Sequence, residues 1–355
     1  MSLNKNYSFL SKALHHLVLG SNMIPEMLYD IEMSIFKKKL DKNNSKSHIF
    51  VCGLPRSGTT ILMNTLYDTG QFASLTYRDM PFVISPNLWS KISSRDITSM
   101  PAKERLHGDS IKVNIDSPEA LEEVFWRVKS NKQYIYSNKL KIHEADEETI
   151  NEYRNFVLLI LNKYKKKFYI SKNNNNILRL ESIIKAFPNC LVIIPFRDPI
   201  QQANSLLIQH KNFTQIQKQD KFVKKYMAYL VHHEFGIIHR PYEFFENSET
   251  SFDNNSIEYW LMQWINAYSY LSQKKFTDNK NILYLNYEYW CENSQNVLKK
   301  ISSKIKLDNS HFINNLKLKK SIKKVEIKEN SIVSKSRNIF NNLNAINNES
   351  FNKNN

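Results

Sequence analysis

One short segment, Gly53-Leu54-Pro55-Arg56-Ser57-Gly58-Thr59-Thr60, constrains the fold of this chain more than any other. It follows an apolar run at 48–53, which has the length and composition of a buried strand, and it precedes residues 59–67, whose apolar positions have helical spacing. The chain has only 6 glycines, and two of them lie in this segment. Glycine allows a sharp turn at position 53 and a close backbone approach to an anion at position 58. The segment therefore predicts a phosphate-binding loop between a strand and a helix N-terminus.

The loop departs from the nucleotide triphosphatase pattern G-x-x-x-x-G-K-[ST] at one position. The glycine spacing matches, but Thr59 stands where the lysine would be, and the positive charge lies inside the loop at Arg56. Without that lysine, a Mg-triphosphate loses its main contact to the β and γ phosphates. We therefore expect a smaller tetrahedral anionic group as the ligand. The residues expected to bind it are Pro55, Arg56, Ser57, Gly58, Thr59 and Thr60.

Further short apolar runs alternate with segments of helical spacing along the chain. We expect buried strands at 168–171, 191–196 and 282–286, with helices between them. This alternation predicts an α/β fold of the P-loop nucleotide-binding type, with a mainly parallel central sheet flanked by helices. We expect a helical N-terminal extension over 1–46, one domain over 47–340, and a disordered, Asn-rich tail over 341–355.

Composition narrows the classes of partner and of location. The chain carries 50 Lys and Arg against 34 Asp and Glu, a formal charge of +16, which favours anionic partners. Abundant Asn, Lys and Ile are also typical of drift in an AT-rich genome, which explains part of this excess. Three scattered cysteines predict neither a disulfide framework nor a zinc site. No apolar run approaches the ~20 residues that span a bilayer, and we find no signal-peptide pattern, so we predict a cytoplasmic protein.

A second candidate site follows the predicted strand at 191–196. The segment Phe196-Arg197-Asp198-Pro199 ends that strand, and Ser205 lies on the helix that Pro199 begins. A guanidinium offers a planar fork of donors, and Ser205 lies about 9 Å along the helix from Pro199. Together Arg197 and Ser205 could bracket a phosphate monoester. The alternative is that Arg197 makes a structural ion pair with Asp198 or another neighbour.

Taken together, these segments resemble PAPS-dependent sulfotransferases, most closely the bacterial ones with arginine in the loop. Residues 55–60 are similar to that family's 5′-phosphosulfate loop, and Arg197 with Ser205 is similar to its 3′-phosphate site. Weaker similarities are Tyr287-Glu288 after the strand at 282–286 and Phe187-Pro188 before the strand at 191–196; the resemblance covers about 47–300. It implies PAPS as co-substrate, no required metal, and sulfuryl transfer to a hydroxyl or amine acceptor. We expect that acceptor to be a carbohydrate or another small polar metabolite.

In-line sulfuryl transfer also needs stabilised charge on the transferring oxygens and a base for the acceptor. Arg56 and the loop amides would supply the first. The resemblance implies a Glu, Asp or His base, which often lies shortly after the first helix, so Asp79 is the first candidate and His107 or Asp109 the second. The alternative for Asp79 is a turn-stabilising role or a pair with Arg78. The acidic residues Glu119, Glu122 and Glu123 are expected on a solvated face of a helix that Ser117 opens.

Other features are assigned to structure rather than chemistry. His232, Glu234 and His239 lack the H-E-x-x-H spacing, which disfavours zinc. The aromatic residues at helical spacing in 259–268 are expected in the core. Rival functions remain open: a kinase or other phosphotransferase with a variant loop, a basic nucleic-acid-binding protein, and a sulfotransferase-like protein that binds nucleotide without turnover.

Overall fold

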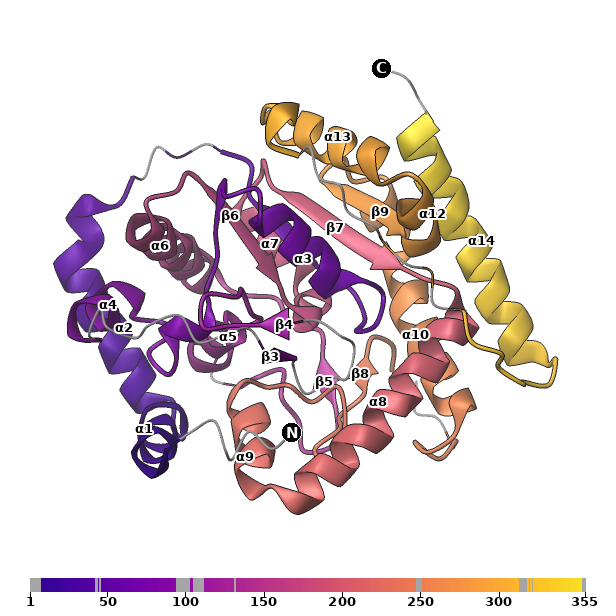
Figure 1. Ribbon diagram of the computed structural model, residues 1–355, viewed down its shortest axis with the longest axis horizontal. Coiled ribbons are helices and arrows are strands. Elements are labelled where there is room, and N and C mark those ends of the chain that lie inside the picture. The colour runs from indigo at the N-terminus through magenta and orange to yellow at the C-terminus, as the bar shows by residue number, and fades with distance from the viewer. Residues whose placement is uncertain are drawn as a thin grey trace.

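The centre of the molecule is a five-stranded sheet in which every neighbouring pair of strands is parallel (Figure 1). A computed structural model describes residues 8–41, 44, 46–93, 103–104, 112–130, 132–246, 251–312, 318, 320 and 322–352. The strands lie in the order β2-β6-β1-β7-β9. Their bounds are β1 (Ile49–Val51), β2 (Phe72–Ala73), β6 (Phe168–Lys172), β7 (Leu191–Phe196) and β9 (Ile282–Asn286). The prediction of an α/β fold with a mainly parallel central sheet is confirmed.

Helices cover both faces of this sheet, which explains why its strands are mostly apolar and are buried along their whole length. Ile49 and Val51 of β1 face one core, which includes side chains of α3 (Thr59–Tyr67) and α13 (Ser294–Lys304). Phe50 faces the other core, with side chains of α6 (Glu147–Tyr164), α7 (Leu180–Ala186) and α10 (Ile257–Leu271). All residues of β1, β6, β7 and β9 are buried.

The remaining elements surround these layers. The other helices are α1 (Phe9–Leu19), α2 (Met23–Phe36), α4 (Pro86–Ile92), α5 (Glu123–Lys129), α8 (Pro199–Gln219), α9 (Lys221–Tyr229), α11 (Lys274–Thr277), α12 (Tyr287–Glu292) and α14 (Ser331–Asn352). Short 3-10 turns are η2 (Lys37–Lys39), η3 (Tyr77–Asp79), η4 (Asn174–Leu178) and η5 (Asn309–Phe312). Two small ladders are β3 (Lys103–Glu104) with β4 (Lys112–Val113), and β5 (Leu140–Lys141) with β8 (Tyr242–Glu243).

The N-terminal helices are attached to the rest of the fold by buried polar contacts. The Glu32 carboxylate, on α2, accepts hydrogen bonds from the backbone N–H groups of Asn87 and Leu88, both at 2.8 Å. These groups belong to the first turn of α4, where unpaired N–H groups and the helix dipole favour a negative charge. Arg127 of α5 donates to the carbonyl of Leu19 at the end of α1 at 2.8 Å.

The prediction of a disordered tail over 341–355 is wrong for the residues that the structure describes there. Residues 341–352 belong to the long helix α14, which lies along β9 and α10 (Figure 1). Leu343 and Phe351 are buried, and the Oδ1 of Asn347 accepts the backbone N–H of Asn286 at 3.0 Å. Asparagine is a weak helix former, so its abundance indicated disorder, but packing against the edge strand outweighs that preference.

No helix among the described segments is long and apolar enough to cross a membrane. The cytoplasmic location stays a prediction.

Candidate functional site

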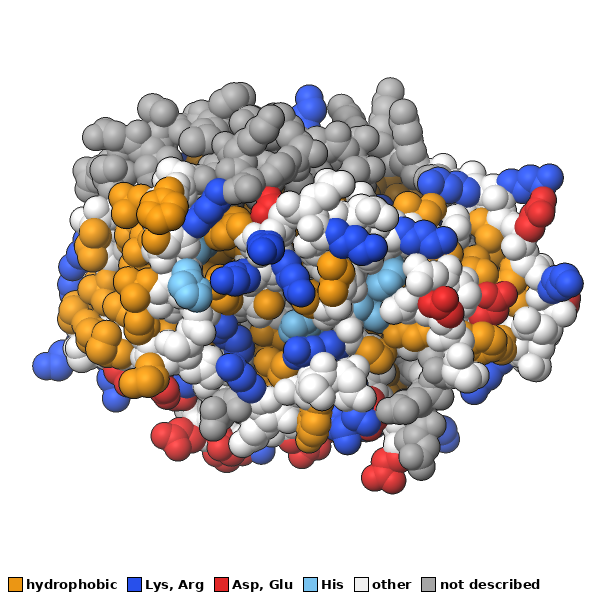
Figure 2. Space-filling view, turned by 90° about the horizontal axis from the view of Figure 1, so that it is seen from below, with side chains coloured by type: hydrophobic (Ala, Val, Ile, Leu, Met, Phe, Trp, Pro, Cys, Tyr) orange, Lys and Arg blue, Asp and Glu red, His pale blue; other side chains and the backbone are white. Residues whose placement is uncertain are grey.

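The loops that follow the strands meet at one edge of the sheet, because the strands are parallel. Residues 53–58 follow β1, 173–176 follow β6, 197–198 follow β7, and α12 follows β9. Ligands of open α/β sheets bind at this edge. The arrow of β7 runs toward the lower right in Figure 1, and Figure 2 shows the molecule from below. Lys, Arg and His side chains gather in the middle of that face, which favours an anionic ligand.

The loop after β1 adopts a backbone that its glycine makes possible. Gly58 has φ 92°, and a Cβ there would lie 2.5 Å from a ring carbon of Tyr287. Arg56 also lies in the left-handed region, at φ 69°. The Ser57 hydroxyl donates to the carbonyl of Leu54 at 2.8 Å, which closes the turn. The helix α3 starts directly after Gly58, so its first N–H groups point toward the space that the loop encloses.

Two helices hold this loop in place from outside. Gln202 of α8 donates to the carbonyl of Pro55 at 2.9 Å, and its own amide oxygen accepts the indole N–H of Trp264 at 3.0 Å. Tyr268, also on α10, donates to the carbonyl of Pro195 in β7 at 2.8 Å. All three supporting side chains are buried. These contacts hold the loop in its shape, and a loop held in this way loses less conformational entropy when it binds a ligand.

The two sequence segments singled out above meet in space. Arg56 Nε donates to the hydroxyl of Ser205 at 3.1 Å, although the two residues are 149 positions apart. Ser205 lies on the second turn of α8, the helix whose first turn Asp198 caps by accepting the N–H of Gln201 at 2.8 Å. The loop after β1 and the helix after β7 therefore meet at a partly exposed polar contact on the protein surface.

Arg197 lies beside the same surface. Its Nε is 3.5 Å from Oε1 of Glu288, and its guanidinium lies over the ring of Tyr287, 5.5 Å from the ring centre. Burial raises the pKa of Glu288, and Arg197 opposes that rise. Asp198 instead caps α8, so the neighbour that Arg197 approaches is Glu288, which fits the structural alternative of an ion pair with another neighbour. The role of Arg197 in binding a phosphate stays a prediction. Tyr287 contacts both the Gly58 position and Arg197.

Comparison with known proteins identifies the family. A model described as "Sulfotransferase family" matches residues 48–310, about three quarters of the chain. The chain belongs to the sulfotransferase family.

Solved sulfotransferase structures resemble this sulfotransferase weakly. STF1 from Mycobacterium tuberculosis H37Rv has a TM-score of 0.47 at 10% identity, over 97% of this chain and 87% of that one. STF9 from Mycobacterium avium has a TM-score of 0.46 at 12% identity, over 86% and 76% of the two chains. A sulfotransferase from Alicyclobacillus acidocaldarius has a TM-score of 0.39 at 9% identity, over 87% and 97%. No curated protein matches the sequence.

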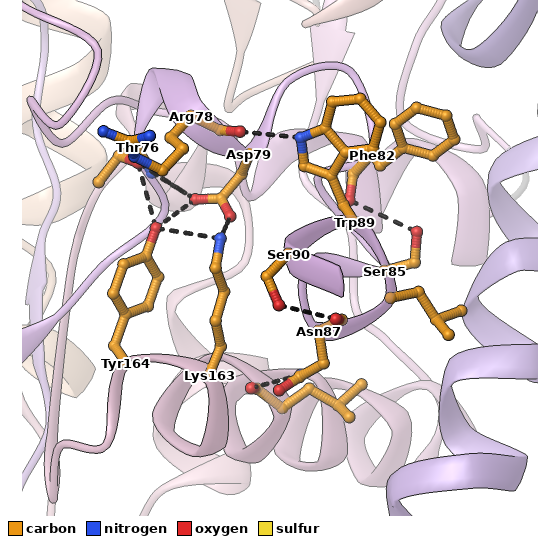
Figure 3. Close-up of polar contacts among 12 residues, drawn as sticks. Thr76, Arg78, Asp79, Phe82, Ser85, Asn87, Trp89, Ser90, Lys163 and Tyr164 are labelled. Atoms are coloured by element: carbon orange, nitrogen blue, oxygen red, sulfur yellow. Dashed lines mark hydrogen bonds and ion pairs between the residues drawn. The ribbon is translucent and has the colours of Figure 1, made fainter. Parts of the chain in front are cut away.

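Asp79, the first candidate base, is fully buried in this sulfotransferase and surrounded by partners (Figure 3). Its carboxylate accepts the backbone N–H of Thr76 at 2.8 Å and the hydroxyl of Tyr164 at 2.6 Å, and it forms an ion pair with Lys163. The bond to Thr76 is part of a capping box around η3. These contacts favour the turn-stabilising alternative. Arg78 pairs instead with Asp116 at 2.7 Å. The role of Asp79 as base stays a prediction.

The second candidates, His107 and Asp109, lie outside the described residues.

The expectation of a solvated face for Glu122 and Glu123 is wrong, because both are buried. The predicted helix from Ser117 actually begins at Glu123, and these two residues point into the core where β6 ends. Glu123 receives a bidentate bond from Arg179, at 2.8 and 3.0 Å. Glu122 accepts from the hydroxyls of Tyr153 and Tyr169, at 2.9 and 2.8 Å. Burial raises the pKa of Glu122, and its hydrogen bonds oppose the rise.

Another charged cluster lies next to the loop and was considered in the sequence only as a zinc site. Glu234 lines a cavity with Leu54 and Pro55 of the loop. His232 Nδ1 is 3.5 Å from a carboxylate oxygen of Glu234. The described residues contain no group of three or more His, Cys, Asp or Glu side chains able to hold a metal ion. The sequence analysis did not predict that residues 232–234 lie near the end of β6. No local sequence pattern indicates this contact, because its partners are about 60 positions apart.

Proposed function

We propose that this sulfotransferase transfers the sulfuryl group of PAPS to a hydroxyl or amine acceptor. The loop 55–60 and the first turn of α3 would bind the 5′-phosphosulfate through backbone N–H groups, the hydroxyls of Thr59 and Thr60, and Arg56. Arg197 and Ser205 would bind the 3′-phosphate. Arg56 would also stabilise charge on the transferring oxygens, so its contribution is electrostatic.

The observation that carries this proposal is the hydrogen bond from Arg56 to Ser205. Two segments that are distant in sequence, and that we propose to bind anions, meet at this bond, as a donor with anionic groups at both ends would require. A nucleotide with a single phosphate chain would use the loop alone. The phosphotransferase alternative lacks the lysine that a Mg-triphosphate loop needs, since Thr59 occupies that position.

A thermal-shift titration with PAP, against AMP and Mg·ATP, tests the proposal. A ligand at 100 times its dissociation constant stabilises the folded state by about 2.7 kcal/mol, which raises Tm by a few degrees in a chain of this size. We expect a shift with PAP that exceeds the shift with AMP, since only PAP carries the 3′-phosphate. Arg197→Ala should reduce the PAP shift to the AMP level.

Other outcomes would redirect the assignment. A shift with Mg·ATP alone would favour a phosphotransferase. No shift with any nucleotide would refute the donor site, and a nucleic-acid partner would then be tested by titration with oligonucleotides. Loss of sulfuryl transfer from PAPS after chelation with EDTA would contradict the expectation of a metal-independent reaction.

A further inference from the structure

The exposed sides of α1 and α2 are apolar, although both helices also bury an apolar side in the protein. Seven of the fifteen exposed large hydrophobic side chains that the structure describes lie on these two helices, and each is 42–88% exposed. They are Phe9, Leu10, Leu17, Met23, Met27, Ile31 and Ile35, called the apolar face below. A surface helix ordinarily carries polar residues on the side that faces water. The apolar face therefore indicates a further contact.

The apolar face is arranged as one surface. On α2, Met23, Met27, Ile31 and Ile35 recur every four residues, so they lie in one row along the helix. Helix α1 contacts α2 and is joined to it by residues 20–22. Figure 2 shows hydrophobic side chains gathered at the left, on the side where α1 and α2 lie in Figure 1. Large contiguous apolar patches on a protein surface mark contacts with another protein or with a membrane.

Lysines flank the apolar face at both ends. At one end, α9 packs against α1, where the rings of Phe222 and His15 are 6.2 Å apart. The exposed lysines of α9 are Lys221, Lys224 and Lys225. At the other end, the exposed lysines of η2 follow α2 directly and are Lys37, Lys38 and Lys39. Neither α1 nor α9 contains an acidic residue, so the charge along this edge is positive.

The exposed acids of this region are fewer than its lysines. Glu26 and Asp30 of α2 have their carboxylates 3.7 and 3.9 Å from the ammonium of Lys129, on α5, which partly neutralises them. Asp41, after η2, is the third exposed acid. The six flanking lysines therefore leave an excess of positive charge around the apolar face.

We propose that α1 and α2 bind an anionic phospholipid surface, with the apolar face at the boundary of the acyl chains and the flanking lysines among the headgroup phosphates. Amphipathic helices that combine apolar side chains with lysines bind membranes in this way, lying in the plane of the surface. Each lysine near such a surface contributes about 5-fold in affinity. The proposal does not depend on the proposed function.

A second copy of this chain would fit the apolar face less well. In a two-fold dimer the same patch contacts itself. Lysines flank the apolar face at both ends, so either orientation of the second copy brings cations against cations, which disfavours association. Headgroup phosphates instead supply the opposite charge, and this complementarity favours the membrane.

Flotation with lipid vesicles tests the proposal on the full chain. One set of vesicles contains equal parts of phosphatidylglycerol and phosphatidylcholine, and the other contains phosphatidylcholine alone. We expect wild type to bind the mixed vesicles and to bind the neutral ones much more weakly. Binding to the mixed vesicles should fall as NaCl is added, because salt screens the lysines.

A double variant tests the apolar contribution. Leu17→Gln/Met27→Gln should weaken binding to the mixed vesicles about 100-fold, because burying each apolar side chain contributes about 10-fold. Both residues are exposed and glutamine is a good helix former, so Tm should be unchanged. The matched control, Ile142→Gln/Ile237→Gln, replaces exposed hydrophobic residues elsewhere and should bind as wild type does.

A second double variant tests the charge. Lys224→Gln/Lys225→Gln should weaken binding about 25-fold and reduce its dependence on NaCl. The matched control, Lys299→Gln/Lys300→Gln, lies on α13 at the top of Figure 1, far from α9, and should bind as wild type does.

Three results would overturn the proposal: no binding to the mixed vesicles, equal binding to both kinds of vesicle, or unchanged binding in either variant of the apolar face and its lysines. A wild-type dimer that Leu17→Gln/Met27→Gln converts to a monomer, seen by analytical ultracentrifugation, would also overturn it and assign the face to a second copy. The thermal shift with PAP should be the same in all four variants. A missing PAP shift in wild type would refute the donor site and leave the vesicle result as it stands.

Discussion

Substituting Gly58 by alanine is the most direct test of the loop geometry. Alanine in a left-handed conformation costs about 1–2 kcal/mol, and φ at this position is 92°. The new Cβ would also lie 2.5 Å from the ring of Tyr287, and forcing an extra carbon into a packed site costs about 1–3 kcal/mol. We therefore expect a loss of about 2–5 kcal/mol in the free energy of unfolding. At about 2.1 cal/mol/K per residue, 355 residues convert this loss to a fall in Tm of about 3–7 °C.

Gly70→Ala is the matched control. Gly70 also has a positive φ, 71°, but no atom lies within 4 Å of a Cβ built there. It should lose only the backbone cost, about 1–3 °C in Tm. Thermal melts with and without PAP measure both effects, and the PAP shift should vanish in Gly58→Ala and persist in Gly70→Ala. Equal falls in Tm for the two variants would refute the close approach of Tyr287. Partial recovery in the double variant Gly58→Ala/Tyr287→Leu would support it.

Three further substitutions test buried polar contacts through thermal melts. Asp79→Asn leaves the Lys163 ammonium buried without its counter-charge, so we expect the free energy of unfolding to fall by about 3–5 kcal/mol. Loss of turnover at an unchanged Tm would instead favour Asp79 as the base. Glu123→Gln should lower the free energy of unfolding by about 3–5 kcal/mol, because Arg179 is buried with it. The control Glu147→Gln, in an exposed ion pair with Lys185, should lower it by less than about 1 kcal/mol. Similar losses in the two variants would contradict this reasoning. Asn347→Ala removes the acceptor of the buried N–H of Asn286 and should lower the free energy of unfolding by about 1–3 kcal/mol. The control Asn341→Ala, at an exposed position, should leave it almost unchanged. An unchanged Tm in Asn347→Ala would show that α14 does not stabilise the edge strand.

The sheet and the loop could be predicted from the sequence because their signals are local. Short apolar runs specify buried parallel strands, and two glycines five positions apart specify the turn before α3. The resemblance implied one co-substrate for the loop 55–60 and for Arg197 with Ser205, but the hydrogen bond from Arg56 to Ser205 is a contact that the sequence did not predict. Whether these residues bind PAPS stays a prediction.

The remaining errors concern residues whose partners are distant in sequence. Acidic residues on a helix are usually solvated. Burial of Glu123 is favourable because Arg179, 56 positions further on, supplies the opposite charge, and Tyr134 and Asn173 donate further hydrogen bonds. Asp79 followed by Pro81 fits either a base or a turn, and its role as base stays a prediction; its ion-pair partner, Lys163, lies 84 positions away. The Asn-rich tail is helical because α14 packs against β9 and α10, and Asn347 accepts the backbone N–H of Asn286. None of these contacts leaves a signal within a short window of sequence.

The position of Tyr287 bears on how far apart the anionic groups of a ligand must be. Its ring lies against the Gly58 position and under the Arg197 guanidinium, and the side chain is buried. A rigid ring between two cationic or N–H-rich regions fixes their separation. A ligand with two anionic groups must match that spacing, and one that is too short or too long can satisfy only one region at a time. The chain would thus discriminate among doubly charged molecules by the distance between their charges, independently of how strongly either region attracts an anion.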